Sequence, residues 1–374
     1  MRIAFAILVA MFCASFGGVP AHGQSSGAAQ PTTPAQDPKA LLREAAKVNG
    51  IRNDEVGPWR LKATFTLYDA MGNATDHGTY EEFWVNQKQS KSVVTSSSFS
   101  QVSYHAHGRW FSTGNQGHAP ILLEKMMGGF SASIPEKLDD FRFTLEDREL
   151  GDHPVRCVLA RPARVSDPYW KATSQCFDAS APIVMAQIDA FGIQRLAEHF
   201  SQFHGRYVAR DVTIAGKGRL YLKAQVESLE EMPKSNPSEF DPPAHAQVEM
   251  ALEEIFKPTS DEMRNILFLA KPAYPARALA AKVSGTVAVE TIIDGQGHVT
   301  DAIAVGGPLE LQDAAVNAVK QYCFNPFSPP NPFSSSEPPV PPGPSARPPA
   351  VSPLFSNVSV FTVLSVTFKL PSEN

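Results

Sequence analysis

The sequence predicts an α+β protein in which a long antiparallel sheet is followed by a smaller module of sheet and helix. Three observations support this class: apolar and polar residues alternate from Trp59 to about Leu229, turn, strand and helix signals follow in order from Lys271 to Phe327, and a Pro- and Ser-rich segment separates the two regions. The length of 374 residues favours two globular units, and an apolar content of 43% suffices for buried cores. The net charge of -5 gives no sign of a nucleic-acid partner.

The N-terminus has the features of a secretory signal. Arg2 precedes an apolar run from Ile3 to Phe12, and Ala21-His22-Gly23 fits the small-x-small pattern before a cleavage site. We therefore expect residues 1–23 to be a signal peptide, residues 24–38 to be a flexible linker, and the mature protein to lie in the periplasm. The alternative is an uncleaved segment that anchors the chain in the inner membrane, although the apolar stretch is shorter than the roughly 20 residues that a spanning helix needs.

Residues 39–232 are predicted to form one antiparallel-sheet domain. In its first strand Leu61, Ala63, Phe65 and Leu67 occupy every second position, as expected of a strand with one buried face. The runs with strand character are Trp59–Leu67, Gly78–Val85, Lys91–Thr95, Gln101–His105, Phe141–Leu145, Val155–Leu159, Ile183–Ile188, Arg206–Ile214 and Leu220–Val226.

Two helices are predicted beside these strands. Pro38–Val48 places Ala40, Leu41, Ala45 and Val48 on one face and charged residues on the other. Ile121–Met127 is the one helix predicted within the run of strands, and Gly128-Gly129 is expected to end it.

Cys157 and Cys176 lie near the edges of two predicted strands. In an oxidising compartment we expect them to form a disulfide, which would add roughly 3 kcal/mol of stability by the chain-entropy model. The alternative is a pair of buried free thiols. Cys323 is left over and is expected to pack as a small apolar residue.

Residues 233–258 are predicted to be a linker, and residues 259–374 a C-terminal domain interrupted by a Pro-rich insert at 328–353. Twelve of the chain's 32 prolines lie between Pro326 and Pro353, a density that no sheet or helix interior accepts. Order is expected to resume at Val358–Leu370, a strand that could form the edge of a sheet because it is the last in the chain. One face of this strand carries Val360, Thr362, Leu364, Val366 and Phe368.

The C-terminal domain contains an ordered set of motifs. Its first part is Pro272-Ala273-Tyr274-Pro275 and a short Ala-rich helix. A strand at Gly285–Ile293, a turn at Asp294–Gly297 and a strand at His298–Val305 follow. A helix from Leu309 to Gln321 carries Ala314-Ala315 and leads into Tyr322–Pro326.

In this order the motifs resemble the C-terminal domain of TonB, the periplasmic module of energy transducers. The resemblance implies binding to TonB-dependent outer-membrane receptors through their TonB box, by addition of a receptor strand to the sheet edge. It also implies ExbB/ExbD-type motor proteins as partners if the N-terminal segment is retained. The residues expected to bind the partner are Lys271, Tyr274, Val360, Thr362, Leu364, Val366 and Phe368. Alternatively, these residues only complete the sheet or pair with a second copy of the chain.

Three departures from the TonB pattern occur, and the last two of them concern the specificity for a partner and not the fold. Tyr322 replaces the usual Trp, Lys271 stands where the family often has Gln, and the Pro-rich insert replaces a short loop before the last strand.

The middle region more weakly resembles LolA-like domains, which are open half-barrels whose hollow holds acyl chains. The resemblance rests on Trp59–Leu67, Gly78–Val85, Cys176-Phe177-Asp178 and Phe240–Pro243. It implies a lipid ligand and a second candidate function, that of a periplasmic carrier or sensor of lipid or lipoprotein.

Signatures of common enzymes are missing from the sequence. Serine-hydrolase, Walker and dinucleotide-binding motifs do not occur, and His105 and His107 are interpreted as surface residues because no Cys or carboxylate lies at ligand spacing. We expect no catalytic residue, metal or cofactor.

Overall fold

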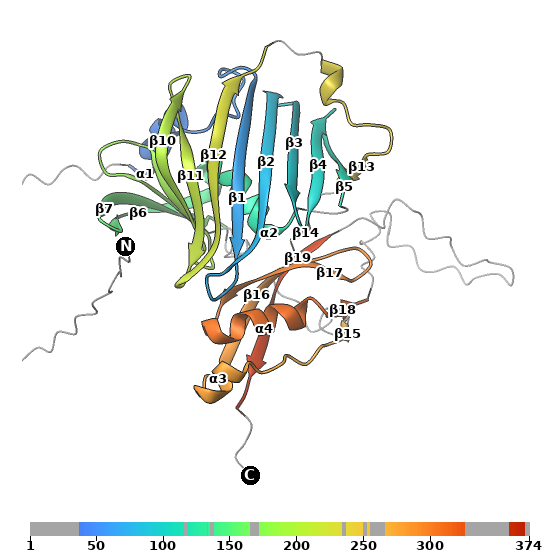
Figure 1. Cartoon of the computed structure of the whole chain (residues 1–374). Coiled ribbons are helices and arrows are strands. Elements are labelled where there is room, and N and C mark those ends of the chain that lie inside the picture. The colour runs from blue at the N-terminus through green and yellow to red at the C-terminus, as the bar shows by residue number, and fades with distance from the viewer. Residues whose placement is uncertain are drawn as a thin grey trace, which may run out of the picture. The chain divides into compact units, whose positions relative to one another are not determined.

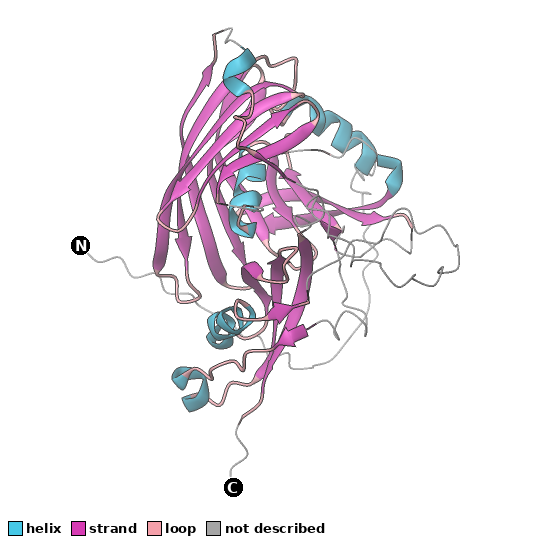
Figure 2. Ribbon diagram, turned by 90° about the vertical axis from the view of Figure 1, so that its right-hand side faces the viewer, coloured by secondary structure: helices cyan, strands magenta, loops and turns pink. Residues whose placement is uncertain are grey.

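The computed structural model describes residues 37–115, 119–132, 134, 138–164, 172–233, 237–249, 253–254, 266–325 and 359–370. They belong to one compact unit, Asp37–Asn374. Strands predominate among the described elements and helices are few, as predicted for an α+β chain (Figure 2). The predicted signal peptide, most of the 24–38 linker and the Pro-rich insert lie outside the described residues.

The larger sheet has thirteen antiparallel strands, several of which stand side by side in Figure 1. In space their order is β13-β5-β4-β3-β2-β1-β12-β11-β10-β9-β8-β7-β6. In chain order they are β1 (Trp59–Tyr68), β2 (Ala74–Asn86), β3 (Gln89–Ser96), β4 (Ser100–Ala106), β5 (Arg109–Gly114), β6 (Phe141–Leu150), β7 (His153–Pro162), β8 (Thr173–Asp178), β9 (Val184–Ile188), β10 (Gln194–Phe203), β11 (Arg206–Gly216), β12 (Arg219–Glu231) and β13 (Gln247–Glu249).

Burial in β1 follows the predicted alternation. Trp59, Leu61 and Ala63 are fully buried and Phe65 nearly so, whereas Arg60 is exposed. Because every second side chain faces the same side, one face of the sheet supplies the main apolar core. The pairing of β1 with β12 joins the first and the last long strand of this region.

Two helices pack against the large sheet. Helix α1 (Pro38–Val48) buries Leu41, Leu42 and Ala45 against Val158, Phe177 and Val184 of β7 to β9. Helix α2 (Ile121–Phe130) belongs to the main core through its apolar residues Ile121, Leu123, Met126 and Phe130.

The predicted end of α2 was wrong. The helix continues through Gly128-Gly129 to Phe130 instead of ending at Met127. A Cβ atom at Gly129 would lie 2.7 Å from a methyl carbon of Val212 in β11. The glycine therefore serves close packing of the helix on the sheet and does not terminate the helix.

The predicted disulfide is confirmed. Cys157 in β7 and Cys176 in β8 are paired directly across the two strands and are bonded to each other. Cys323 is the free cysteine of the described residues and is partly buried.

Part of the segment predicted as linker lies on the large sheet. A 3-10 helix at Pro237–Phe240 buries the Phe240 side chain, and β13 pairs with β5. Among the described residues this segment therefore adds the thirteenth strand.

The smaller sheet has four strands in the order β14-β19-β16-β17. As predicted, a hairpin connects its second and third strands in the chain, and the Asp294 carboxylate holds the turn by accepting hydrogen bonds from the backbone of Gln296 and His298. Helix α4 packs on this sheet, and Ala278 of α3 belongs to the same apolar core. The elements of this module are β14 (Glu253–Glu254), β15 (Ile266–Phe268), α3 (Ala276–Ala280), β16 (Gly285–Ile293), β17 (Val299–Gly306), α4 (Leu309–Val319), β18 (Cys323–Phe324) and β19 (Val360–Phe368).

The last strand differs in one respect from the predicted edge strand. β14 pairs with it in parallel at Val360 and Phe361, because a short part of the preceding connection reaches the sheet. From Thr362 to Phe368, β19 has β16 as its one strand partner among the described residues. The prediction of an edge is therefore wrong for the first two residues and holds for the rest.

Candidate partner-binding edge

A four-stranded sheet has two edges, and unpaired N–H and C=O groups at an edge are a template for another strand. In the smaller sheet the edges are β17 on one side and β19, beyond the two residues of β14, on the other. What covers each edge decides where a partner strand could pair.

Side chains of the large-sheet region cover β17. The Tyr221 hydroxyl donates to the Ala304 carbonyl at 2.7 Å, and the Lys217 ammonium donates to the Val305 carbonyl at 3.3 Å. Tyr221 is itself buried. Because these carbonyls already accept hydrogen bonds, β17 is a poor template for a further strand.

Apolar contacts extend this cover across one face of the small sheet. Ile292 of β16 and Ile303 and Val305 of β17 belong to the same apolar core as α2 and the large sheet. At the other end, the Arg219 guanidinium lies 3.3 Å from the Asp313 carboxylate of α4. The small sheet is therefore packed against its neighbour through a shared core.

A buried charge cluster lies within this contact. The Lys125 ammonium of α2 is 2.9 Å from the Asp189 carboxylate and 3.3 Å from the Glu290 carboxylate of β16. Burial, strengthened by the charges of Asp189 and Asp301 and opposed by Lys125, raises the pKa of Glu290 to about 7. Burial lowers the pKa of Lys125, but the two carboxylates outweigh it and raise that pKa overall.

The open part of β19 presents a different surface. Ser365 and Thr367 are exposed, whereas the alternate residues face inward. The five β19 residues predicted to bind a partner are all buried: Val360, Thr362, Leu364, Val366 and Phe368. Their side chains thus complete the small sheet, and what β19 can offer a partner is its main chain together with Ser365 and Thr367, which sequence reasoning missed.

The structure brings two of the predicted site residues together. The Tyr274 ring meets the Phe368 ring edge to face, with centroids 5.6 Å apart. The Tyr274 hydroxyl donates to the Val283 carbonyl, which fixes the ring beside the last strand. Lys271 is exposed, and no contact within the described residues joins its side chain to this pair.

An exposed apolar run precedes Lys271. Leu267, Phe268 and Leu269 have 64%, 54% and 56% of their surface exposed, although three consecutive apolar side chains usually mark a buried strand. Only the backbone pairing of β15 with β18 holds the run within the described chain. The sequence did not signal this exposure.

The inner face of the large sheet leaves little room for a ligand next to α2. Phe130, Arg195 and Phe200 line a cavity of about 10 Å³ between the helix and strands β9 to β11. A cavity of this size holds about one water molecule, so an acyl chain has no space at this point.

Among the described residues, no cluster of three or more His, Cys, Asp or Glu side chains has metal-binding geometry. Within the same residues, no helix combines the length and the apolar character needed to cross a bilayer.

Residues 270–336 match the family model of the Gram-negative bacterial TonB protein C-terminal domain. The match confirms the resemblance predicted from the motifs and covers less than half of the chain. This part of the C-terminal module is therefore similar in sequence to TonB C-terminal domains. No curated protein sequence matches the chain at a significant level.

Solved structures similar to the chain include LolA-superfamily proteins, as the weaker resemblance predicted. LolA superfamily protein NE2245 from Nitrosomonas europaea has 9% identity and a TM-score of 0.37, covering 55% of this chain and 97% of that protein. A putative outer membrane lipoprotein-sorting protein domain from Vibrio parahaemolyticus has 10% identity and a TM-score of 0.37, covering 54% and 95%. MucB in complex with MucA(peri) has 12% identity and a TM-score of 0.23, covering 68% and 74%. With TM-scores below 0.5, these likenesses carry no weight for the function of this chain.

Proposed function

We propose that the chain is a non-enzymatic periplasmic protein that binds TonB-dependent outer-membrane receptors by strand addition to β19. The observation that carries the proposal is the contrast between the two sheet edges. Tyr221 and Lys217 already occupy carbonyls of β17, whereas Thr362–Phe368 has no second strand partner among the described residues.

In this mechanism an extended receptor segment pairs with the main chain of β19. Backbone hydrogen bonds supply the affinity, and side chains beside the edge supply the selectivity. Tyr274 stiffens the end of β19 through its contact with Phe368, and exposed Lys271 offers a positive charge to the receptor segment. The exposed run Leu267-Phe268-Leu269 adds apolar surface close in sequence to Lys271.

Energy coupling depends on the N-terminus. If residues 1–23 are removed, the protein is a soluble partner of receptors in the periplasm. If they are retained, the chain is anchored in the inner membrane and ExbB/ExbD-type motor proteins become partners. Sequencing the N-terminus of the protein isolated from the cell envelope separates these cases, since a start at Gln24 supports the first and an intact Met1 the second.

Amide hydrogen exchange of the full chain, with and without a TonB-box peptide, tests the binding mode. We expect the peptide to slow exchange within Thr362–Phe368 and to leave Val299–Gly306 unchanged, because side chains of Tyr221 and Lys217 already hold carbonyls of the second segment. A peptide of equal length with proline at alternate positions serves as the control, since it cannot donate a full row of hydrogen bonds. No slowing at millimolar peptide, or slowing in β17 instead, would contradict the proposal.

The lipid or lipoprotein carrier is the alternative function, and it needs the half-barrel hollow that a LolA-like domain implies. The cavity beside α2 is too small to be that hollow. Native mass spectrometry of the purified chain distinguishes the two functions, since a co-purifying acyl species would favour the carrier.

A further inference from the structure

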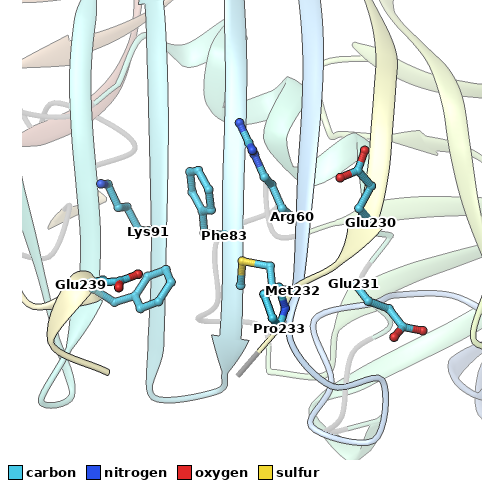
Figure 3. A pocket seen from close by; sticks show the side chains of 9 residues that line it. Arg60, Phe83, Lys91, Glu230, Glu231, Met232, Pro233 and Glu239 are labelled. Atoms are coloured by element: carbon cyan, nitrogen blue, oxygen red, sulfur yellow. The ribbon is translucent and has the colours of Figure 1, made fainter. Parts of the chain in front are cut away.

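The face of the large sheet opposite α2 carries a row of alternating cationic and aromatic side chains. Arg60 of β1 pairs with Phe83 of β2, Phe83 pairs with Lys91 of β3, and Lys91 pairs with Tyr104 of β4. Residues directly opposite each other in adjacent strands direct their side chains to the same face. Figure 3 shows Arg60, Phe83 and Lys91 extending from three neighbouring strands.

The two cations of this row differ in their partners. The Arg60 guanidinium lies 5.1 Å from the centre of the Phe83 ring and 3.1 Å from the Glu81 carboxylate. The Lys91 ammonium lies 5.9 Å from the Phe83 ring centre and 5.6 Å from that of Tyr104. No carboxylate of the described residues is within ion-pair distance of Lys91. The ammonium is therefore positioned by two rings and keeps its hydrogen-bond donors for a ligand.

The chain that follows β12 turns this row into a pocket of about 350 Å³. Met232 and Pro233 line it, and the ring of buried Phe240 lies 6.4 Å from that of Phe83. These apolar groups form a lining suited to one apolar side chain of a ligand.

Acidic side chains occupy the rim of the same pocket. Glu230, Glu231 and Glu239 line it together with the two cations. In Figure 3, Lys91 and Glu239 lie on one side of Phe83, and Arg60 and Glu230 lie on the other. Three carboxylates repel a polyanion such as a lipid phosphate headgroup, while two cations disfavour a purely cationic ligand. The charge pattern is complementary to a ligand that carries both signs.

We propose that this pocket binds a short peptide with free termini and an apolar side chain. The peptide's terminal carboxylate pairs with Lys91, its apolar side chain packs on Phe83 and Phe240, and its terminal ammonium pairs with Glu230. Lys91 and Glu230 are three strand spacings apart, which is about 14 Å at the backbone and less between the side-chain tips. An extended tripeptide spans about 10 Å, so its two ends reach both groups.

Isothermal titration of the full chain with Ala-Leu-Ala tests the site. We expect saturable binding of the free tripeptide, and at least about tenfold weaker binding of the same peptide with an acetylated N-terminus and an amidated C-terminus. Gly-Gly-Gly should also bind more weakly, because it has no side chain to place against Phe83.

Variants of the protein locate the binding. Lys91→Gln should weaken Ala-Leu-Ala binding at least about tenfold, and Lys91→Arg should retain most of it. Lys62→Gln is the matched control: Lys62 lies on the same face of β1, is paired with Glu227 at 3.1 Å, and does not line the pocket. Thermal unfolding by circular dichroism verifies that each variant is folded.

The proposal is overturned if the free tripeptide does not bind at millimolar concentration. It is also overturned if blocked and free peptides bind equally, or if Lys91→Gln and Lys62→Gln have equal effects. The proposed receptor binding takes place at β19 of the smaller sheet, whereas this pocket lies on the large sheet. Either proposal can therefore fail while the other holds.

Discussion

The two edge strands of the small sheet, β17 and β19, are similar in themselves. They differ in how far other parts of the chain cover them. β17 is covered by side-chain donors and a shared apolar core, whereas β19 is paired with two residues of β14 and, beyond them, has no second strand partner in the described part of the chain. Both strands have buried faces, so burial of side chains does not distinguish them. The difference lies in the backbone groups. A sheet can thus be kept from unwanted pairing at one edge and remain receptive at the other.

The largest effect on the free energy of unfolding is expected from removing the positive charge of Lys125, which lies where α2 contacts the small sheet. Lys125→Met leaves the Glu290 and Asp189 carboxylates without their cation in a buried site. At about pH 9, where Glu290 is ionised, we expect the free energy of unfolding to fall by about 3 to 5 kcal/mol, as when one partner of a buried ion pair is lost. Urea denaturation measures the change. The double variant Lys125→Met with Glu290→Leu should recover a large part of the loss, and a loss below about 1 kcal/mol in the single variant would contradict the role of the cluster.

The second-largest expected effect is a dependence of the free energy of unfolding on pH, through Glu290 in the same contact. Glu290 has a pKa near 4.5 when unfolded and about 7 when folded, so between these values the folded state binds more protons. The free energy of unfolding should therefore decrease as pH rises from 4.5 to about 7 and level off above that, with an amplitude of up to about 3 kcal/mol. Lys125, Asp189 and Asp301 all act on this carboxyl. Denaturation of wild type and Glu290→Gln across this range measures the difference; parallel curves would argue against it.

A smaller effect is expected from removing a single donor at β17. Tyr221→Phe leaves the Ala304 carbonyl without its buried partner and should lower the free energy of unfolding by about 1 to 3 kcal/mol. Amide exchange in Val299–Gly306 should accelerate as the edge loosens. Tyr104→Phe is the control, because the Tyr104 hydroxyl has no hydrogen-bond partner within the described chain.

The smallest effect on stability is expected for a substitution on β19 that should weaken peptide binding. Thr367→Lys places a charge on the open edge strand, a device that natural sheets use against strand addition. We expect the free energy of unfolding to change by no more than about 0.5 kcal/mol, and TonB-box peptide to bind about threefold to tenfold more weakly. Thr300→Lys is the matched control, since Thr300 is exposed on β17 and, like Thr367, makes one side-chain hydrogen bond. Equal loss of binding in both variants would show that the two edges are not distinct.

The alternation of apolar and polar residues predicted those strands in which one face is apolar and the other polar. Leu61, Ala63 and Phe65 are buried as expected, and Leu220–Val226 lies within β12. β10 was not predicted, because polar residues occupy both of its faces and His199 adopts a positive φ of 52° that interrupts the regular backbone. Its place in the sheet is determined by pairing with β9 and β11, which local sequence does not encode.

The site was predictable only in part, for the same reason. The motifs placed Tyr274 at the start of the module, and the structure adds its contact with Phe368. Alternation in β19 identified a coherent face, but that face proved to be the buried one. Which edge stays open depends on contacts such as Tyr221 with Ala304, whose partners are 83 residues apart in the chain. No periodicity within either segment reports such a contact.

The position of the Pro-rich insert has a kinetic consequence. β19 pairs with β16 along nine residues, yet it follows β18 only after the whole insert. Lengthening a loop adds little to the entropy of closure, so the insert costs the folded state little stability. Strands distant in sequence nevertheless pair late, because the chain must close before their contacts form. During synthesis, the hairpin of β16 and β17 can form before the last strand arrives. The β19 edge would then be the last part of the small sheet to be completed, and it would appear only once the other edge is already in place.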